Sequence, residues 1–261
     1  MALENILKMS AHRRLTQTDR SSQDGRRVST GIAERFGRIL ERKNSAALRC
    51  GRDPGDITLM AVTKTHTPEE INEAIAAGAT DIGENRVQEL LEKYDKVSPV
   101  RWHLIGHLQT NKVKNIIDKV VMIHSVDSVR LAREIDKRAA AAGKTMDILI
   151  EINSAMEETK SGIAAGDLRE ITEEITAGCS NVRIRGIMCI PPIAADPEEA
   201  RPYFREAHEL FETMKTWDLP EDRFSPDTLS MGMSGDFEVA VEEGSTIVRV
   251  GSSIFGPRNY R

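Results

Sequence analysis

The chain has 261 residues, of which 39% are hydrophobic and 30% are charged, and its formal net charge is −5. This length suits one large α/β domain as well as two smaller ones, and we expect one. The negative charge argues against nucleic acids and anionic membranes as partners, because both bind clustered positive charge. No apolar run approaches the roughly 20 residues of a membrane span, so we expect a cytoplasmic protein.

The first residues differ in composition from the remainder. Residues 1–27 scatter arginines among Ser, Thr, Gln and Asp without sustained apolar periodicity, which predicts a flexible N-terminal extension. A transit peptide is the alternative, but Glu4, Asp19 and Asp24 disfavour it. The three cysteines show no paired CxxC spacing, so neither a disulfide framework nor a zinc cluster is expected.

Short apolar runs and helical patterns then alternate along the chain. After a helix within residues 28–49, strands are predicted at 57–65, 81–85, 101–106, 120–126, 147–153, 184–190, 228–231 and 246–250. Helices are predicted at 68–77, 87–91, 110–119, 128–142, 168–177, 197–217 and 236–243. Eight strands with helical connections and no break between halves predict a single closed (β/α)8 barrel, the TIM-barrel fold, over residues 28–261.

Lys64 ends the first predicted strand, in the run ITLMAVTKT. Strand side chains alternate between faces, so Lys64 shares the apolar face of Met60 and Val62 and is predicted to point into the barrel. A buried ammonium is costly unless something neutralises or uses it. The alternative is that the strand frays and the side chain reaches solvent.

Functional sites of such barrels lie at the carboxyl ends of the strands. His103 and His107 lie near one of these ends, but no HExxH glutamate or third ligand accompanies them, so we expect a loop that shapes a pocket and no metal site. The polar residues expected at this end of the barrel are Lys64, Asn85, His103, His107, Asn153, Ser230, Ser234, Arg249, Gly251 and Ser252.

Two glycine-containing turns near the end of the chain indicate anion binding. SMGMSGD at 230–236 joins a strand to a helix, and VGSS at 250–253 leaves the last strand in the same way. Backbone N–H groups at such turns, helped by hydroxyls, form phosphate sites, which barrels commonly place after strands seven and eight. The alternative is two glycine turns that merely close the barrel.

A lysine able to form an imine, a phosphate site and Arg249 between them are the parts needed to hold pyridoxal 5′-phosphate. The segments AVTKTHTPEEI, DIGENRVQE, WHLIGHLQTNK, EINSAMEETKSGI, RGIMCIPP, LSMGMSGDFEVA and VRVGSSIFGPR carry a close resemblance to a known family. Over residues 28–258 the chain resembles the YggS/PROSC family of pyridoxal phosphate homeostasis proteins. Two departures are visible: Ser252 stands where the family usually has threonine, and Cys189 where a small residue is common.

The resemblance implies a barrel like the N-terminal domain of alanine racemase, with pyridoxal phosphate held as a Schiff base on Lys64 and no established catalytic activity. It implies that Asn85 borders the ring and that Arg249 faces the pyridine nitrogen. We also include His107 among the cofactor-binding residues. The residues implied to contact the phosphate are Ser230, Ser234, Gly251 and Ser252.

Two functions follow as hypotheses. The first is a monomeric, non-catalytic carrier that buffers the cofactor and delivers it to apo-enzymes that depend on it. The second is an enzyme such as an amino-acid racemase, which needs a second acid/base on the other face of the ring, commonly a tyrosine. None of Tyr94, Tyr203 and Tyr260 is an evident candidate.

Overall fold

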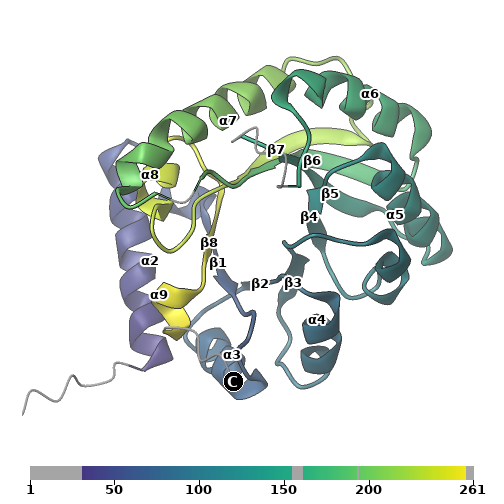
Figure 1. Ribbon diagram of the computed structural model, residues 1–261. Helices are drawn as coiled ribbons and strands as arrows, with labels where there is room; N and C mark the ends of the chain where they lie inside the picture. The colour runs from purple at the N-terminus through teal and green to yellow at the C-terminus, as the bar shows by residue number, and fades with distance from the viewer. Residues whose placement is uncertain (1–30, 155–160, 193, 257–261) are drawn as a thin grey trace, which may run out of the picture. The chain divides into compact units, whose positions relative to one another are not determined.

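Eight short strands pair in chain order, each parallel to the next, and the last pairs with the first (Figure 1). The computed structural model describes residues 31–154, 161–192 and 194–256. The predicted parallel (β/α)8 barrel is therefore confirmed. The strands are β1 (Thr58–Val62), β2 (Asp81–Glu84), β3 (Arg101–Leu104), β4 (Met122–Val126), β5 (Met146–Ile152), β6 (Val182–Cys189), β7 (Phe224–Ser230) and β8 (Ile247–Val250).

Helices surround the strands (Figure 1). The α-helices are α2 (Ile32–Arg49), α3 (Pro68–Ala76), α4 (Val87–Tyr94), α5 (Val129–Ala141), α6 (Leu168–Gly178), α7 (Arg201–Met214), α8 (Phe237–Glu242) and α9 (Ser252–Phe255). The 3₁₀ helices are η1 (Pro54–Asp56), η2 (Thr110–Asn115), η3 (Ala165–Asp167) and η4 (Pro197–Ala200). The proposed extension, residues 1–27, lies outside the described residues, so its separation from a barrel beginning at residue 28 stays a prediction.

Three helices differ from the prediction. The segment 110–119 forms only the short 3₁₀ helix η2, although Val113, Ile116 and Ile117 are buried as their spacing indicates. Asparagine and β-branched residues have low helix propensity, which accounts for the shorter element. The helix predicted at 197–217 divides into η4 and α7, and α9 follows β8 where a simple turn was expected. Four residues are too few for a periodic pattern to reveal α9.

The strands bury both faces, as strands covered by helices do. On β1, Leu59 and Ala61 belong to the main core, which also includes residues of the surrounding helices. Met60 and Val62 instead belong to a separate interior cluster with Ile105 and Ile247. The face predicted for Lys64 is therefore the face that looks into the barrel.

A second small apolar cluster, Met122, Leu149 and Met188, comes from β4, β5 and β6.

The start of β1 is tied to α2 by Lys43, whose Nζ donates to the carbonyls of Pro54 and Ile57 at 2.7 Å each. Across the described residues, no helix combines the length and the apolar character needed to cross a bilayer.

Candidate functional site

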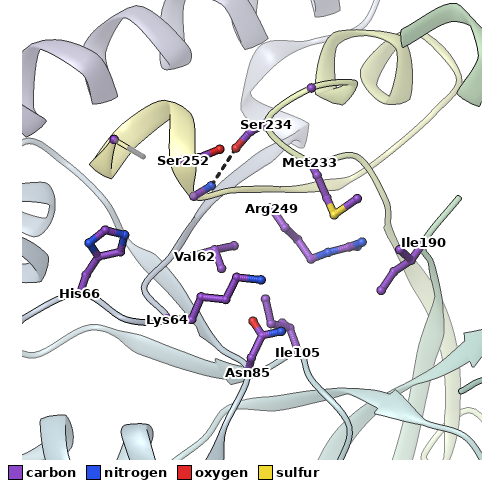
Figure 2. A pocket seen from close by; sticks show the side chains of 13 residues that line it. Val62, Lys64, His66, Asn85, Ile105, Ile190, Met233, Ser234, Arg249 and Ser252 are labelled. Carbon is purple, nitrogen blue, oxygen red and sulfur yellow. Dashed lines mark hydrogen bonds between the residues drawn. The ribbon is translucent and has the colours of Figure 1, made fainter. Parts of the chain in front are cut away.

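A cavity of about 270 Å³ opens where the carboxyl ends of β1, β2 and β8 meet the loop after β7. The structure brings six of the eight predicted site residues to it, namely Lys64, Asn85, Ser234, Arg249, Gly251 and Ser252. Figure 2 shows the side chains of Lys64, Asn85 and Arg249 pointing into the cavity. Polar groups thus gather at the barrel end where such folds place their sites.

Lys64 lies two residues beyond β1, in the loop to α3, and its side chain is half-buried. Thr65, the next residue, has φ +67°, a left-handed conformation that is an outlier for a β-branched residue. Its N–H donates to Glu89 Oε2 at 2.7 Å. Such strain persists only where surrounding contacts impose it, and it is common at functional sites. The loop that presents Lys64 is therefore held in a defined shape.

A buried ionic cluster also holds this loop in place. Lys93 Nζ donates to the carbonyl of Thr63 at 2.9 Å, to Glu84 Oε1 at 2.6 Å and to Glu89 Oε2 at 3.0 Å. Burial raises the pKa of the Glu84 carboxyl, and the nearby Lys93 opposes that rise. This cluster was not predicted from the sequence, because Lys93 on α4 resembles an ordinary surface lysine.

Asn85 follows β2 and is held by a close approach of the β3 end. A Cβ atom at Gly106 would lie 2.4 Å from the Asn85 carbonyl oxygen, so only glycine fits there. Asn85 Oδ1 is buried and has no hydrogen-bond partner within the part of the chain that the structure describes. Buried polar atoms are rarely left unsatisfied, so this oxygen indicates a ligand group or water in the cavity.

Arg249 on β8 is 4% exposed. Its Nη1 donates to Ser230 Oγ at 2.7 Å, and its Nη2 donates to the carbonyl of Cys189 at 3.0 Å. Burial lowers the pKa of Arg249, yet an arginine keeps its proton at any ordinary pH. The cavity therefore holds a fixed, desolvated positive charge.

The two glycine turns converge on one hydroxyl. Ser234 Oγ accepts the backbone N–H of Gly251 at 3.2 Å and that of Ser253 at 3.4 Å (Figure 2 draws the first). Ser252 and Gly235 complete this wall of the cavity. Because Ser234 Oγ accepts these N–H groups, its own proton is left to donate, and hydroxyl donors suit phosphate oxygens.

The other two of the eight predicted site residues, Ser230 and His107, lie elsewhere, as does His103, which was expected at the same end of the barrel. Ser230 is fully buried below the cavity, where its hydroxyl contacts Arg249 and His124. His107 is exposed, and its Nδ1 lies 3.4 Å from Asp127 Oδ2. His103 was expected at the barrel mouth, but it points inward and its Nε2 lies 2.9 Å from Asp81 Oδ1, at the first residue of β2. Side-chain alternation predicts the face of a strand residue but not its hydrogen-bond partners on other strands.

Asn153 also lies apart from this wall. Its backbone N–H donates to the carbonyl of Ile163 at 2.9 Å, which ties the end of β5 to the segment before η3. The described residues contain no group of three or more His, Cys, Asp or Glu side chains placed to hold a metal ion. No metal site is inferred at the His103–His107 segment.

The sequence analysis missed several lining residues. His66 lies two residues after Lys64 and stacks on Phe255 with ring centroids 4.5 Å apart. Burial lowers the pKa of His66, against the opposing effect of Glu70. Its place in the lysine loop was the signal available in the sequence. The apolar part of the lining consists of Val62, Ile105, Ile190 and Met233.

Comparisons with known proteins agree with this geometry. The family described as "Alanine racemase, N-terminal domain" matches residues 42–259. The pyridoxal phosphate homeostasis protein of Aquifex aeolicus is 47% identical over 229 residues, which cover 87% of this chain and 98% of the relative. The chain belongs to the family of pyridoxal phosphate homeostasis proteins. The resemblance that the sequence motifs indicated is thereby confirmed.

Solved structures support the same assignment. PipY of Synechococcus elongatus, in a structure with PLP bound, is 34% identical with a TM-score of 0.68, and the match covers 84% of this chain and all of PipY (100%). Alanine racemase of Corynebacterium glutamicum is 14% identical with a TM-score of 0.64, covering 84% of this chain and 60% of the enzyme. The racemase likeness shows the shared fold alone. The homologue from Aquifex is named as a homeostasis protein and not as an enzyme.

Proposed function

We propose that this protein binds pyridoxal 5′-phosphate in the cavity at the barrel mouth and acts as a carrier in the homeostasis of that cofactor. The observation that carries the proposal is the meeting of Lys64, Arg249 and the wall around Ser234 in one cavity. Family membership supports it, as does the binding of pyridoxal phosphate by PipY.

Different residues of the cavity would bind different parts of the cofactor. The aldehyde of the cofactor can condense with a primary amine, with loss of water, and Lys64 supplies the amine. The hydroxyls of Ser234 and Ser252, beside Gly251, would hold the phosphate. Ser234 Oγ already accepts the backbone N–H groups of Gly251 and Ser253, so its own proton is left to donate. Asn85 would border the ring, where its buried Oδ1 gains a partner.

Arg249 makes the site more suited to holding the cofactor than to catalysing a reaction with it. A guanidinium beside the ring nitrogen disfavours a second positive charge there, so the ring would stay unprotonated and would withdraw electrons weakly. The described lining contains no tyrosine and no carboxylate, and His66 is its one further acid/base. A racemase would need such a group on the opposite face of the ring, which is the alternative to be tested.

The experiment is reductive trapping of the cofactor with borohydride, followed by peptide mass mapping. Purified protein loaded with pyridoxal phosphate should be yellow, and the adduct should map to Lys64. Lys64→Arg should lose the adduct, whereas the control Lys112→Arg, on η2 away from the cavity, should keep it. An adduct that remains on another lysine in Lys64→Arg would overturn the assignment.

The same loaded protein distinguishes the carrier from the racemase. In D₂O with alanine, deuterium exchange at the α carbon should stay near the rate that the free cofactor gives. Exchange with enzymatic turnover, lost in His66→Gln, would favour the racemase. Delivery to apo-enzymes, the monomeric state and a cytoplasmic location are further parts of the proposal, and proteins captured by the loaded form but not by the unloaded form would identify the recipients.

A further inference from the structure

A chain of hydrogen bonds crosses the barrel interior beneath the cavity and ends on Arg249. Ser230 Oγ accepts from Arg249 Nη1 at 2.7 Å and lies 3.1 Å from His124 Nδ1. His124 Nε2 lies 3.0 Å from His103 Nδ1, and His103 Nε2 lies 2.9 Å from Asp81 Oδ1. Five strands, β8, β7, β4, β3 and β2, contribute one residue each.

Every member of this polar chain is buried. Ser230 and His124 are 0% exposed, Asp81 is 2% exposed, and His103 and Arg249 are 4% exposed. Two apolar clusters also occupy the interior, one around Met60 and one around Met122, Leu149 and Met188. A polar group in such surroundings is stable only when its hydrogen bonds are made, so removal of one member leaves its neighbours unsatisfied.

The chemistry of the groups sets the direction of each bond. Arginine only donates, so Ser230 Oγ accepts from Arg249, and its single proton can go to His124 Nδ1. The Asp81 carboxylate only accepts, so a neutral His103 carries its proton on Nε2 and accepts at Nδ1. Burial lowers the pKa of His124 well below its ordinary value, and the nearby Arg249 charge adds to this effect. A neutral His124 that accepts at Nδ1 carries its proton on Nε2 and donates it to His103 Nδ1. His103 then donates from Nε2 to the Asp81 carboxylate.

We propose that Ser230, His124 and His103 are positioning residues that aim the Arg249 guanidinium at the cavity, with the Asp81 carboxylate anchoring the far end of the chain. Ser230 then acts through Arg249 and not on a phosphate. The carbonyl of Cys189 holds the other terminal nitrogen, so acceptors from β7 and β6 together set the plane of the guanidinium. The effect on the cofactor ring rests on the proposed function, whereas the bond directions do not.

The first test uses the protein without cofactor. Nitrogen-15 NMR of the histidine side chains should show His124 and His103 as Nε2–H tautomers, assigned by the loss of each signal in His124→Gln and His103→Gln. A proton on Nδ1 of His124 would overturn the directions inferred here. This result does not depend on whether the cofactor binds.

The second test separates positioning from phosphate contact. Ser230→Ala should weaken pyridoxal phosphate and unphosphorylated pyridoxal by the same factor, about tenfold or more, because Arg249 faces the ring that both ligands share. The absorption of the bound cofactor should also report a ring nitrogen that protonates at higher pH than in the wild type. Met188→Leu changes a buried interior residue that does not belong to the hydrogen-bonded chain, and it should alter neither the affinities nor the absorption.

Loss of affinity for the phosphorylated ligand alone in Ser230→Ala would return Ser230 to the phosphate site and overturn the proposal. An unchanged absorption profile would do the same. If neither ligand binds the wild type, the proposed function fails while the NMR result stands separately. If Ser230→Ala misfolds, His124→Gln provides a second test. It removes the next residue of the hydrogen-bonded chain and should give the same shift in absorption.

Discussion

Ser252 and Ser253 are adjacent serines with different surroundings. Ser252 lines the cavity, whereas the Ser253 hydroxyl donates to the carbonyl of Ser234 at 3.4 Å. Both belong to the short helix α9 after β8, but the Ser253 side chain does not line the cavity. At the scale of single residues, the pair can therefore separate direct phosphate contact from local structure.

We expect Ser252→Ala to weaken pyridoxal phosphate but not unphosphorylated pyridoxal. The loss of one hydrogen bond to a charged group costs about 1.5–3 kcal/mol. Titration of both ligands against Ser252→Ala and the control Ser253→Ala measures this difference. An equal loss for both ligands in Ser252→Ala would remove this hydroxyl from the phosphate site.

The loop between β1 and α3 is shaped by elements on either side of it. Thr67 caps α3 and forms a reciprocal capping box with Glu70, and Pro68 begins the helix. On the other side, Lys93 of α4 holds the carbonyl of Thr63. At the scale of elements, α4 therefore controls a loop that belongs to the preceding strand and helix.

Lys93→Met should destabilise the protein by about 3–5 kcal/mol, because Glu84 would remain buried without its ionic partner. Cofactor affinity should fall with it, since the Lys64 loop loses an anchor. Denaturant unfolding and cofactor titration measure the two effects, with the exposed Lys96→Met as control. The double variant Lys93→Met/Glu84→Gln should recover part of the stability; a double variant no more stable than Lys93→Met would contradict this account.

The interior polar chain links the stability of the whole barrel to pH. Burial opposes ionisation of Asp81, but hydrogen bonds from His103, Arg101 and Thr80 hold the pKa of its carboxyl well below the ordinary value. Asp81 therefore adds stability above about pH 3.9 that is lost as the pH falls further. His124 has a lowered pKa, so below about pH 6.5 the unfolded chain takes up a proton that the folded chain does not.

The free energy of unfolding should therefore fall as the pH drops from about 6.5 to 5, with up to about 1.4 kcal/mol per pH unit due to His124. His124→Gln should flatten this part of the curve, and Asp81→Asn should leave it unchanged. Denaturant unfolding at a series of pH values measures the slopes, with Met188→Leu as the packing control. Equal slopes in the wild type and His124→Gln would show that His124 is not held neutral in the folded protein.

The repeat of eight strands and the inward direction of Lys64 could be predicted from the sequence, because apolar periodicity and side-chain alternation are local properties. The sequence also located the glycine turns near Ser234 and Gly251, since close backbone turns restrict residue type. The family motifs pointed to the same residues. Six of the predicted site residues accordingly line one cavity.

The contacts of the buried polar side chains depend on the three-dimensional arrangement of the strands and could not be predicted from the sequence. His124 and Ser230 are 106 residues apart in sequence, and barrel closure brings them to 3.1 Å. Lys93 of α4 meets the Thr63 carbonyl, 30 residues earlier in the chain, which helical spacing alone does not reveal. His107, which follows β3, instead faces solvent. Local patterns specify which face a residue occupies, whereas its partners depend on how distant strands come together when the barrel closes.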